Sequence, residues 1–263
     1  MAVGLSGLSG LPGPVSAVCH TFLGAVPDGL VTGLHLRGGL AFGEWVPGRS
    51  DVDFVAVLAQ RPGAAEVEAL RVAHVATAAA HPDVFFDGAH VVAGDLERDP
   101  DLLPPVPSVL MRRFDPAGPT EPLVAWAELA AGGVTVHGPA LPDVWTDQDR
   151  LLAHTRSNLD TYWRGWADRL ASGPAELVDD ETTTWCVLGA TRLHHLLVTR
   201  RMTAKSRAGR WALEAYDVRW RRVLREALRI REGGRDEYPG DPALRGRDVA
   251  DLTAHVVAEG TAT

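Results

Sequence analysis

The sequence is poor in cysteine and in long apolar segments. Cys19 and Cys186 are the only cysteines among its 263 residues, which excludes a disulfide framework and a CxxC metal site. We expect both thiols to be buried. The longest apolar stretches are too short to cross a bilayer, and no basic residue precedes a hydrophobic segment at the N-terminus. We therefore expect a cytoplasmic protein that does not bind membranes.

Clustered positive charge is also lacking. Lys205 is the only lysine, and the formal net charge is −8. Nonspecific binding to nucleic acid depends on clustered Lys and Arg that displace counterions, so we expect no nucleic-acid partner. An acidic protein suits a polycationic small molecule, although solubility explains the same charge equally well. We expect the chain to act as a monomer.

Several well-known site motifs are missing. The sequence contains neither a GxxxxGK[ST] phosphate loop nor a GxSxG nucleophile elbow. The adjacent His194 and His195 lack the spacing of metal ligands. No internal repeat is visible.

The hydrophobic pattern changes near residue 142. Before it, strand and helix patterns alternate, and after it long helical patterns dominate. We predict an α+β protein with a flexible lead at 1–13, a first domain at 14–142 and an all-helical domain at 143–263. The first domain should contain strands at 30–38, 51–58, 84–92 and 134–138, helices at 14–25, 40–45, 64–81 and 122–131, and a proline-rich connection at 103–108. The second should contain helices at 148–171, 183–201, 207–231 and 245–259.

Two carboxylates at the start of a buried strand are the central feature. Asp51 and Asp53 precede the apolar run FVAVL. Alternate residues of a strand share a face, so the two side chains should project together. Mg²⁺ prefers oxygen ligands and commonly takes one or two carboxylates together with substrate phosphates. The alternative is that DxD only caps the entry to the strand.

Glycines upstream strengthen the metal hypothesis. Eleven residues separate Gly38-Gly39 from Asp51, and a Gly-Gly step lets backbone approach a ligand closely. A short helix after them would direct its amides at phosphate. We assign Gly38, Gly39 and Ser50 to a nucleotide-binding loop. An ordinary tight turn would need the same glycines.

A third carboxylate, Asp87, lies between Phe85-Phe86 and the apolar AHVVA. A buried carboxylate is unfavourable unless it meets a metal, a hydrogen-bonding network or a reacting group. Beside the Asp51 strand, it could bind metal or accept a proton from an attacking hydroxyl. Alternatively, Asp87-Gly88 is a turn before the strand.

The segment LHLRGGLAFGEWVPGRSDVDFVAVL resembles the signature of the DNA polymerase β-like nucleotidyltransferases. VTVHGPALPDVWTDQDRL and GATRLHHLLVTRRMTAKSRAGRWAL are similar to the C-terminal half of streptomycin/spectinomycin adenylyltransferases. The resemblance runs from about residue 30 to residue 215. It implies a nucleotidyltransferase domain with a mixed sheet and flanking helices, a C-terminal helical bundle, and ATP with two Mg²⁺ ions in a cleft between them.

The resemblance also implies roles for individual residues. Asp51 and Asp53 would bind metal, Asp87 would replace the catalytic glutamate of the family, and Arg192 and Lys205 would contact nucleotide phosphates. Arg192 shares a helix side with Trp185, Leu188 and Leu196. A partly buried arginine requires an anion, which could be triphosphate or an internal carboxylate.

This sequence departs from the family at two positions. Gly39 replaces the usual serine, and losing one hydroxyl bond to a phosphate should cost about 1.5–3 kcal/mol. Asp87 is one methylene shorter than the family's glutamate. The two changes leave three hypotheses open: adenylylation of an aminoglycoside, nucleotidyl transfer to another acceptor, and a nucleotide-binding regulator without catalysis.

The acceptor implied by the resemblance is an aminoglycoside, whose ammonium groups acidic side chains would attract. Asp179, Asp180 and Glu181 are candidates, although they precede a helix and could equally cap it. Trp163 and Trp166 could stack on a sugar or pack in the core.

Overall fold

The computed structural model describes residues 10–118 and 123–262. Residues 1–9 of the predicted flexible lead lie outside the described residues, as does Pro122 of the predicted helix at 122–131. The chain divides into two units, Met1–Thr146 and Asp147–Thr263, and the predicted boundary near residue 142 lies shortly before this division. Among the described helices, none combines the length and apolar character needed to span a membrane.

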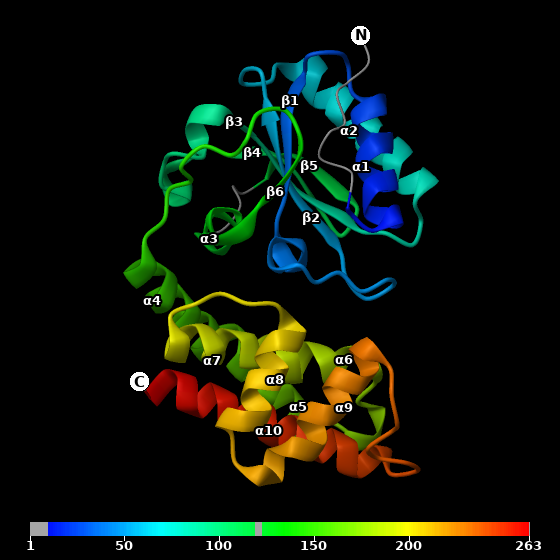
Figure 1. Ribbon diagram of the computed structural model, residues 1–263, viewed down its shortest axis with the longest axis vertical. Coiled ribbons are helices and arrows are strands. Elements are labelled where there is room, and N and C mark those ends of the chain that lie inside the picture. The colour runs from blue at the N-terminus through cyan, green and yellow to red at the C-terminus, as the bar shows by residue number, and fades with distance from the viewer. Residues whose placement is uncertain (1–9, 119–122, 263) are drawn as a thin grey trace. The chain divides into compact units, whose positions relative to one another are not determined.

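A six-stranded mixed sheet forms the centre of the first unit (Figure 1). Its strands lie in the order β5-β4-β3-β2-β1-β6. Only β2 and β3 run parallel, and the other neighbouring strands are antiparallel. The strands are β1 (Val31–Leu36), β2 (Val52–Leu58), β3 (Phe86–Val92), β4 (Val106–Leu110), β5 (Arg113–Gly118) and β6 (Val134–His137).

Helices cover both faces of this sheet. Helices α1 (Gly13–Ala25) and α2 (Ala64–Ala80) lie on one face and α3 (Leu123–Gly132) on the other (Figure 1). Phe22, Phe54 and Leu70 belong to the core under α1 and α2, and Val55 and Trp126 to the core under α3. Because β2 and β3 are covered on both sides, they are almost continuously apolar. The exceptions are Asp53 and Asp87, near their N-terminal ends, and His90 within β3.

The hairpin of β4 and β5 was not expected from the sequence, which predicted only a proline-rich connection at 103–108. Prolines disrupt a strand pattern because they lack an N–H donor, but a sheet tolerates them at irregularities, and the β4–β5 register shifts between Val106 and Ser108. Pro107 lies within β4 and uses its carbonyl to accept a hydrogen bond from His90. The predicted short helix at 40–45 is the 3₁₀ helix η1 (Gly38–Phe42), and further 3₁₀ turns are η2 (Ala93–Asp95) and η3 (Pro100–Leu102).

The second unit is helical, as predicted. Its elements are α4 (Gln148–Asn158), the π-helical turn η4 (Leu159–Trp163), α5 (Arg164–Ser172), η5 (Ala175–Leu177), α6 (Asp180–Thr184), the π-helical turn η6 (Trp185–Gly189), α7 (Ala190–Thr199), α8 (Lys205–Ala215), η7 (Val218–Trp220), α9 (Arg221–Glu232) and α10 (Pro242–Ala262). Trp163, Leu188 and Leu224 lie in its core.

One helix prediction in this unit is wrong. The single helix expected at 207–231 is two helices, α8 and α9, separated near Tyr216 and Asp217. The Asp217 side chain accepts the N–H of Arg219 and starts a new turn, which the apolar pattern alone did not indicate. The predicted α+β class, with a mixed sheet followed by an all-α unit, is confirmed. Cys19 and Cys186 are both buried, as expected.

Candidate active site

Asp53 and Asp87 lie side by side on the two parallel strands. They are direct partners in the β2–β3 register, so their side chains emerge on the same face of the sheet. The Asp53 side chain is 31% exposed, whereas the Asp87 residue is only 7% exposed. The negative charge of Asp53 helps to raise the pKa of Asp87. The sheet thus brings together two of the three predicted metal ligands.

The Asp87 carboxylate is only partly satisfied by hydrogen bonds. Its Oδ2 accepts the backbone N–H of Met111 at 2.8 Å, while its buried Oδ1 has no partner among the described residues. Burial is the main cause that raises the pKa of Asp87 above its usual value, and the amides of Met111 and Arg112 only partly oppose it. A buried carboxylate oxygen without a donor is suited to a cation or a proton.

Asp51 has a different position. It immediately precedes β2 and is exposed. Within residues 10–118 and 123–262, no three His, Cys, Asp or Glu side chains form a group that could hold a metal ion. The structure therefore pairs Asp53 with Asp87 but does not assemble all three carboxylates into one cluster. Two carboxylates nevertheless fit Mg²⁺, which usually completes its octahedral shell with water and phosphate oxygens.

Gly38 packs directly against the Asp53 carboxylate. Its φ of +64° lies in the left-handed region, and a Cβ at this position would meet Asp53 Oδ2 at 2.1 Å. The preceding residue, Arg37, donates its backbone N–H to the Asp53 carbonyl at 2.9 Å. Any side chain at position 38 would displace the carboxylate, so glycine is required for contact with Asp53 as well as for the backbone conformation.

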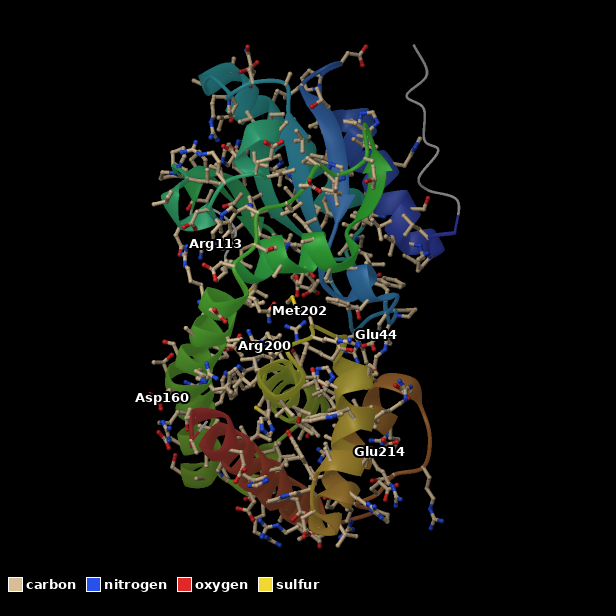
Figure 2. All side chains as sticks on the ribbon, turned by 60° about the vertical axis from the view of Figure 1, so that its left-hand side comes forward. Glu44, Arg113, Asp160, Arg200, Met202 and Glu214 are labelled. Carbon is tan, nitrogen blue, oxygen red and sulfur yellow. The ribbon has the colours of Figure 1, made fainter. Side chains whose placement is uncertain are left out.

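The loop after Gly38 is closed by its own backbone. Glu44, labelled in Figure 2, donates its N–H to the Gly39 carbonyl at 2.9 Å, and a Cβ on Gly39 would meet the Glu44 carbonyl oxygen at 2.5 Å. This tight loop therefore leaves no room for a side chain at position 39. At the other end, the Ser50 hydroxyl accepts the N–H of Val46 at 3.1 Å and stabilises the turn before β2.

The sequence analysis missed Glu128. This residue of α3 is 2% exposed, pairs with Arg37 Nη1 at 3.0 Å and accepts the Gly38 N–H at 3.2 Å. Arg37 Nη2 in turn lies 3.9 Å from Asp53 Oδ1. The Gly38 amide is thus already engaged by Glu128. The available signal was a single acid in the otherwise apolar helix LVAWAELAAG, because such an acid needs a buried partner.

The two predicted phosphate contacts lie in the helical unit. Arg192 is in α7 and half-buried, and Lys205 is the first residue of α8. Lys205 Nζ lies 4.6 Å from the centre of the Trp185 ring, which is a cation–π arrangement. Trp185 is 39% exposed and begins the π-helical turn η6. Such turns are frequent at functional sites, so Trp185 is a site candidate that the sequence analysis did not propose.

The predicted acceptor carboxylates have separate structural roles. Asp179 accepts the Thr182 N–H at 2.7 Å and caps α6, and this bond is the main cause that lowers its pKa. Asp180 pairs with Arg245 at 2.7 Å. Glu181 is exposed. Trp163 is 4% exposed within the core, which fits the packing interpretation.

Comparison with known proteins finds a family model that matches the helical unit and a solved structure with a similar fold. Residues 158–259 match the family model described as the aminoglycoside adenylyltransferase C-terminal domain. The fold is similar to that of spectinomycin adenyltransferase AAD(9) from Enterococcus faecialis, solved with ATP and spectinomycin. That similarity has a TM-score of 0.57 at 12% identity and covers 90% of this chain and 98% of the other. No curated protein matches this chain by sequence.

The two comparisons agree. The family model lies entirely within the helical unit, and the structural match extends across the sheet unit. Residues 158–259 are therefore similar to an aminoglycoside adenylyltransferase C-terminal domain, and the chain has a fold similar to that of a spectinomycin adenyltransferase.

Proposed function

We propose that this protein transfers AMP from ATP to a hydroxyl group of an aminoglycoside-type antibiotic and releases pyrophosphate. The observation that carries the proposal is the Asp53–Asp87 pair, held in register beside Gly38. The match of residues 158–259 to an aminoglycoside adenylyltransferase domain supports the acceptor class. The neighbouring structure, solved with ATP and spectinomycin, supports ATP as donor.

Mg²⁺ fits the residues at the end of β2 and β3. Asp53 and Asp87 supply hard oxygen ligands, and the buried Oδ1 of Asp87 has no donor among the described residues. Asp51 is an exposed carboxylate just before β2. A bound ion would supply charge neutralisation for the triphosphate and acidify the acceptor hydroxyl.

Asp87 is the proposed general base. Its pKa is raised mainly by burial, so its ionised form accepts a proton more readily than an exposed aspartate does. In the proposed reaction the acceptor oxygen attacks the α-phosphorus in line, and its proton passes to Asp87. A new P–O bond forms while the bond to the pyrophosphate oxygen breaks.

Other residues bind the substrates or position these groups. Glu128 holds Arg37 and the Gly38 amide, and so keeps the loop against Asp53. Gly39 and Ser50 shape the same loop. Arg192 and Lys205 are proposed to contact the phosphates. Among Asp179, Asp180 and Glu181, we propose Glu181 as the main contact for acceptor ammonium groups, because the other two side chains cap α6 and pair with Arg245.

The test is pyrophosphate release measured with ATP, Mg²⁺ and a panel of acceptors. We expect release that depends on both Mg²⁺ and streptomycin or spectinomycin. In Asp53→Asn it should fall by roughly a thousandfold or more, since a lost metal ligand removes several kcal/mol of transition-state stabilisation. Undiminished turnover in Asp53→Asn would contradict the metal assignment. Pyrophosphate release with other acceptors only would assign the enzyme a different class of acceptor. ATP binding without turnover would indicate a nucleotide-binding regulator.

A further inference from the structure

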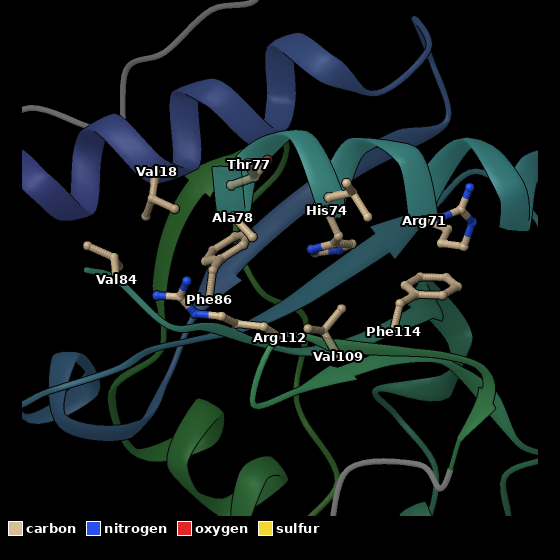
Figure 3. Close-up of a pocket in the computed structure, with 11 residues that line it drawn as sticks. Val18, Arg71, His74, Thr77, Ala78, Val84, Phe86, Val109, Arg112 and Phe114 are labelled. Carbon is tan, nitrogen blue, oxygen red and sulfur yellow. The ribbon is translucent and has the colours of Figure 1, made fainter. Parts of the chain in front are cut away.

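A cavity of about 230 Å³ lies in the first unit on the face of the sheet opposite Asp53 and Asp87. Phe86 lines it, and Phe86 precedes Asp87 in β3, so the two side chains point to opposite faces. Figure 3 shows α2 above the cavity and the strands that carry Phe86, Val109 and Phe114 below it. The proposed nucleotidyl transfer does not use this cavity.

The size and walls of the cavity suit one ring. An engineered apolar cavity of about 150 Å³ in another protein holds benzene, so about 230 Å³ holds a six-membered ring with a short substituent. Val18, Val109, Phe86 and Phe114 contribute apolar or aromatic surface. Aromatic walls favour an aromatic occupant through offset or edge-to-face contacts.

Arg112 supplies a positive charge at the mouth. Its side chain lines the cavity, and the ion pairs of the described residues do not include it. The guanidinium lies over the Phe85 ring at 4.6 Å and donates to the Pro82 carbonyl. Arg112 belongs to the β4–β5 turn, whose Met111 amide is held by Asp87. The charge is therefore carried by a fixed turn and is available to an anion.

His74 supplies a hydrogen-bond acceptor inside. His90 Nδ1 lies 2.9 Å from the Pro107 carbonyl, which only accepts, so His90 Nδ1 carries the proton and His90 Nε2 accepts. His74 Nε2, 3.1 Å from His90 Nε2, must then donate. Burial lowers the pKa of both rings, so both stay neutral. His74 Nδ1 is left as an acceptor, because the hydrogen bond of this ring in the described part of the chain is made by Nε2.

We propose that this cavity binds a hydroxylated single-ring aromatic carboxylate. Its ring would lie between Phe86 and Phe114, its carboxylate would face Arg112, and its hydroxyl would donate to His74 Nδ1. The three groups match the apolar walls, the unneutralised guanidinium and the unoccupied acceptor of the cavity.

The probe is 4-hydroxybenzoate, titrated calorimetrically into the full chain. We expect saturable binding of one molecule per chain. Arg112→Gln should weaken it by roughly tenfold or more, because a charge-assisted hydrogen bond is lost. Arg113→Gln is the matched control, since Arg113, labelled in Figure 2, neighbours Arg112 but does not line the cavity. Asp53→Asn should also bind normally, because Asp53 lies on the opposite face of the sheet.

Two further measurements test the chemistry of the site. 4-Hydroxybenzyl alcohol, without the carboxylate, and benzoate, without the hydroxyl, should both bind more weakly than 4-hydroxybenzoate. Ala78→Met should fill the cavity and abolish binding while circular dichroism remains native. Absence of saturable binding, equal effects of Arg112→Gln and Arg113→Gln, or full binding by folded Ala78→Met would each overturn the proposal.

Discussion

Both units bury acidic side chains, and Glu226 and Asp87 differ in how they are satisfied. In the helical unit, the Glu226 side chain is fully buried, accepts two hydrogen bonds from Arg229 and one from the Glu237 amide, and lies 3.6 Å from Arg245. Burial acts to raise the pKa of Glu226, but these partners outweigh it and the pKa is lowered. In the sheet unit, the pKa of Asp87 is raised.

The difference separates a structural acid from a functional one. Glu226 has enough hydrogen-bond donors to stay ionised without any ligand, so its interactions stabilise the packing of the helices. Asp87 has a buried oxygen without a donor and a second carboxylate, Asp53, beside it. The pKa of both residues is shifted, so a shift by itself does not distinguish their roles. The direction of the shift and its cause do.

The largest effect should follow removal of the structural acid. Glu226→Ala removes the carboxylate that pairs with the partly buried Arg229 and leaves Arg245 with Asp180 alone, and breaking a buried pair typically costs about 3–5 kcal/mol of unfolding free energy. Urea unfolding followed by circular dichroism measures this loss. Glu232→Ala is the control, because its pair with Arg210 is exposed and should contribute less than about 1 kcal/mol. Equal losses of unfolding free energy in the two variants would contradict the distinction between the buried and the exposed acid.

The next effect concerns the sheet unit. In Gly38→Ala the new Cβ would displace the Asp53 carboxylate, so we expect pyrophosphate release to fall by about a hundredfold, or about 2.7 kcal/mol in the barrier. Gly48→Ala is a matched control, since Gly48 also has a positive φ, +68°, but has open space around its Cβ position. If both variants lose the same activity, backbone strain and not the Asp53 contact is responsible.

A smaller effect is expected at the start of α6. Asp179→Ala removes the cap on the Thr182 amide and should cost about 1 kcal/mol of stability. Glu181→Ala should leave the unfolding free energy unchanged but raise the KM for the aminoglycoside, if Glu181 attracts its ammonium groups. Thermal unfolding and steady-state kinetics on the two variants measure the two roles separately. A KM change confined to Asp179→Ala would contradict our assignment.

The smallest effect tests whether folding raises the pKa of Asp87. A carboxyl whose pKa is raised on folding destabilises the fold when it ionises, so this cost is absent at low pH and grows as pH rises through the raised pKa. Asp87→Asn should therefore be more stable than the original protein at neutral pH. The advantage should shrink as the pH falls toward the ordinary range of aspartate. Urea unfolding across this pH range measures it, and an advantage that increased in acid would reverse our interpretation.

Periodicity and local chemistry predicted much of the fold. The alternating pattern of β1, the apolar runs of β2 and β3 and the long helical patterns after residue 142 correspond to observed elements. The β4–β5 hairpin and the break between α8 and α9 were missed. Local sequence signals could not show either feature. The proline-containing β4 forms a strand because it pairs with its neighbours in the sheet, and the turn at Asp217 interrupts a helical pattern that is otherwise continuous.

By itself, the sequence determined which residues are available for chemistry: a glycine step, a DxD at a strand entry and an acid in an apolar strand. The tertiary structure decided which of them meet. The parallel register places Asp87 beside Asp53, and the packing of α3 brings Glu128 to Arg37 across 91 positions of the chain. Spacing along a chain does not encode such contacts, because they depend on how strands pair and helices pack. For the same reason, Glu128 became a candidate only in the folded protein.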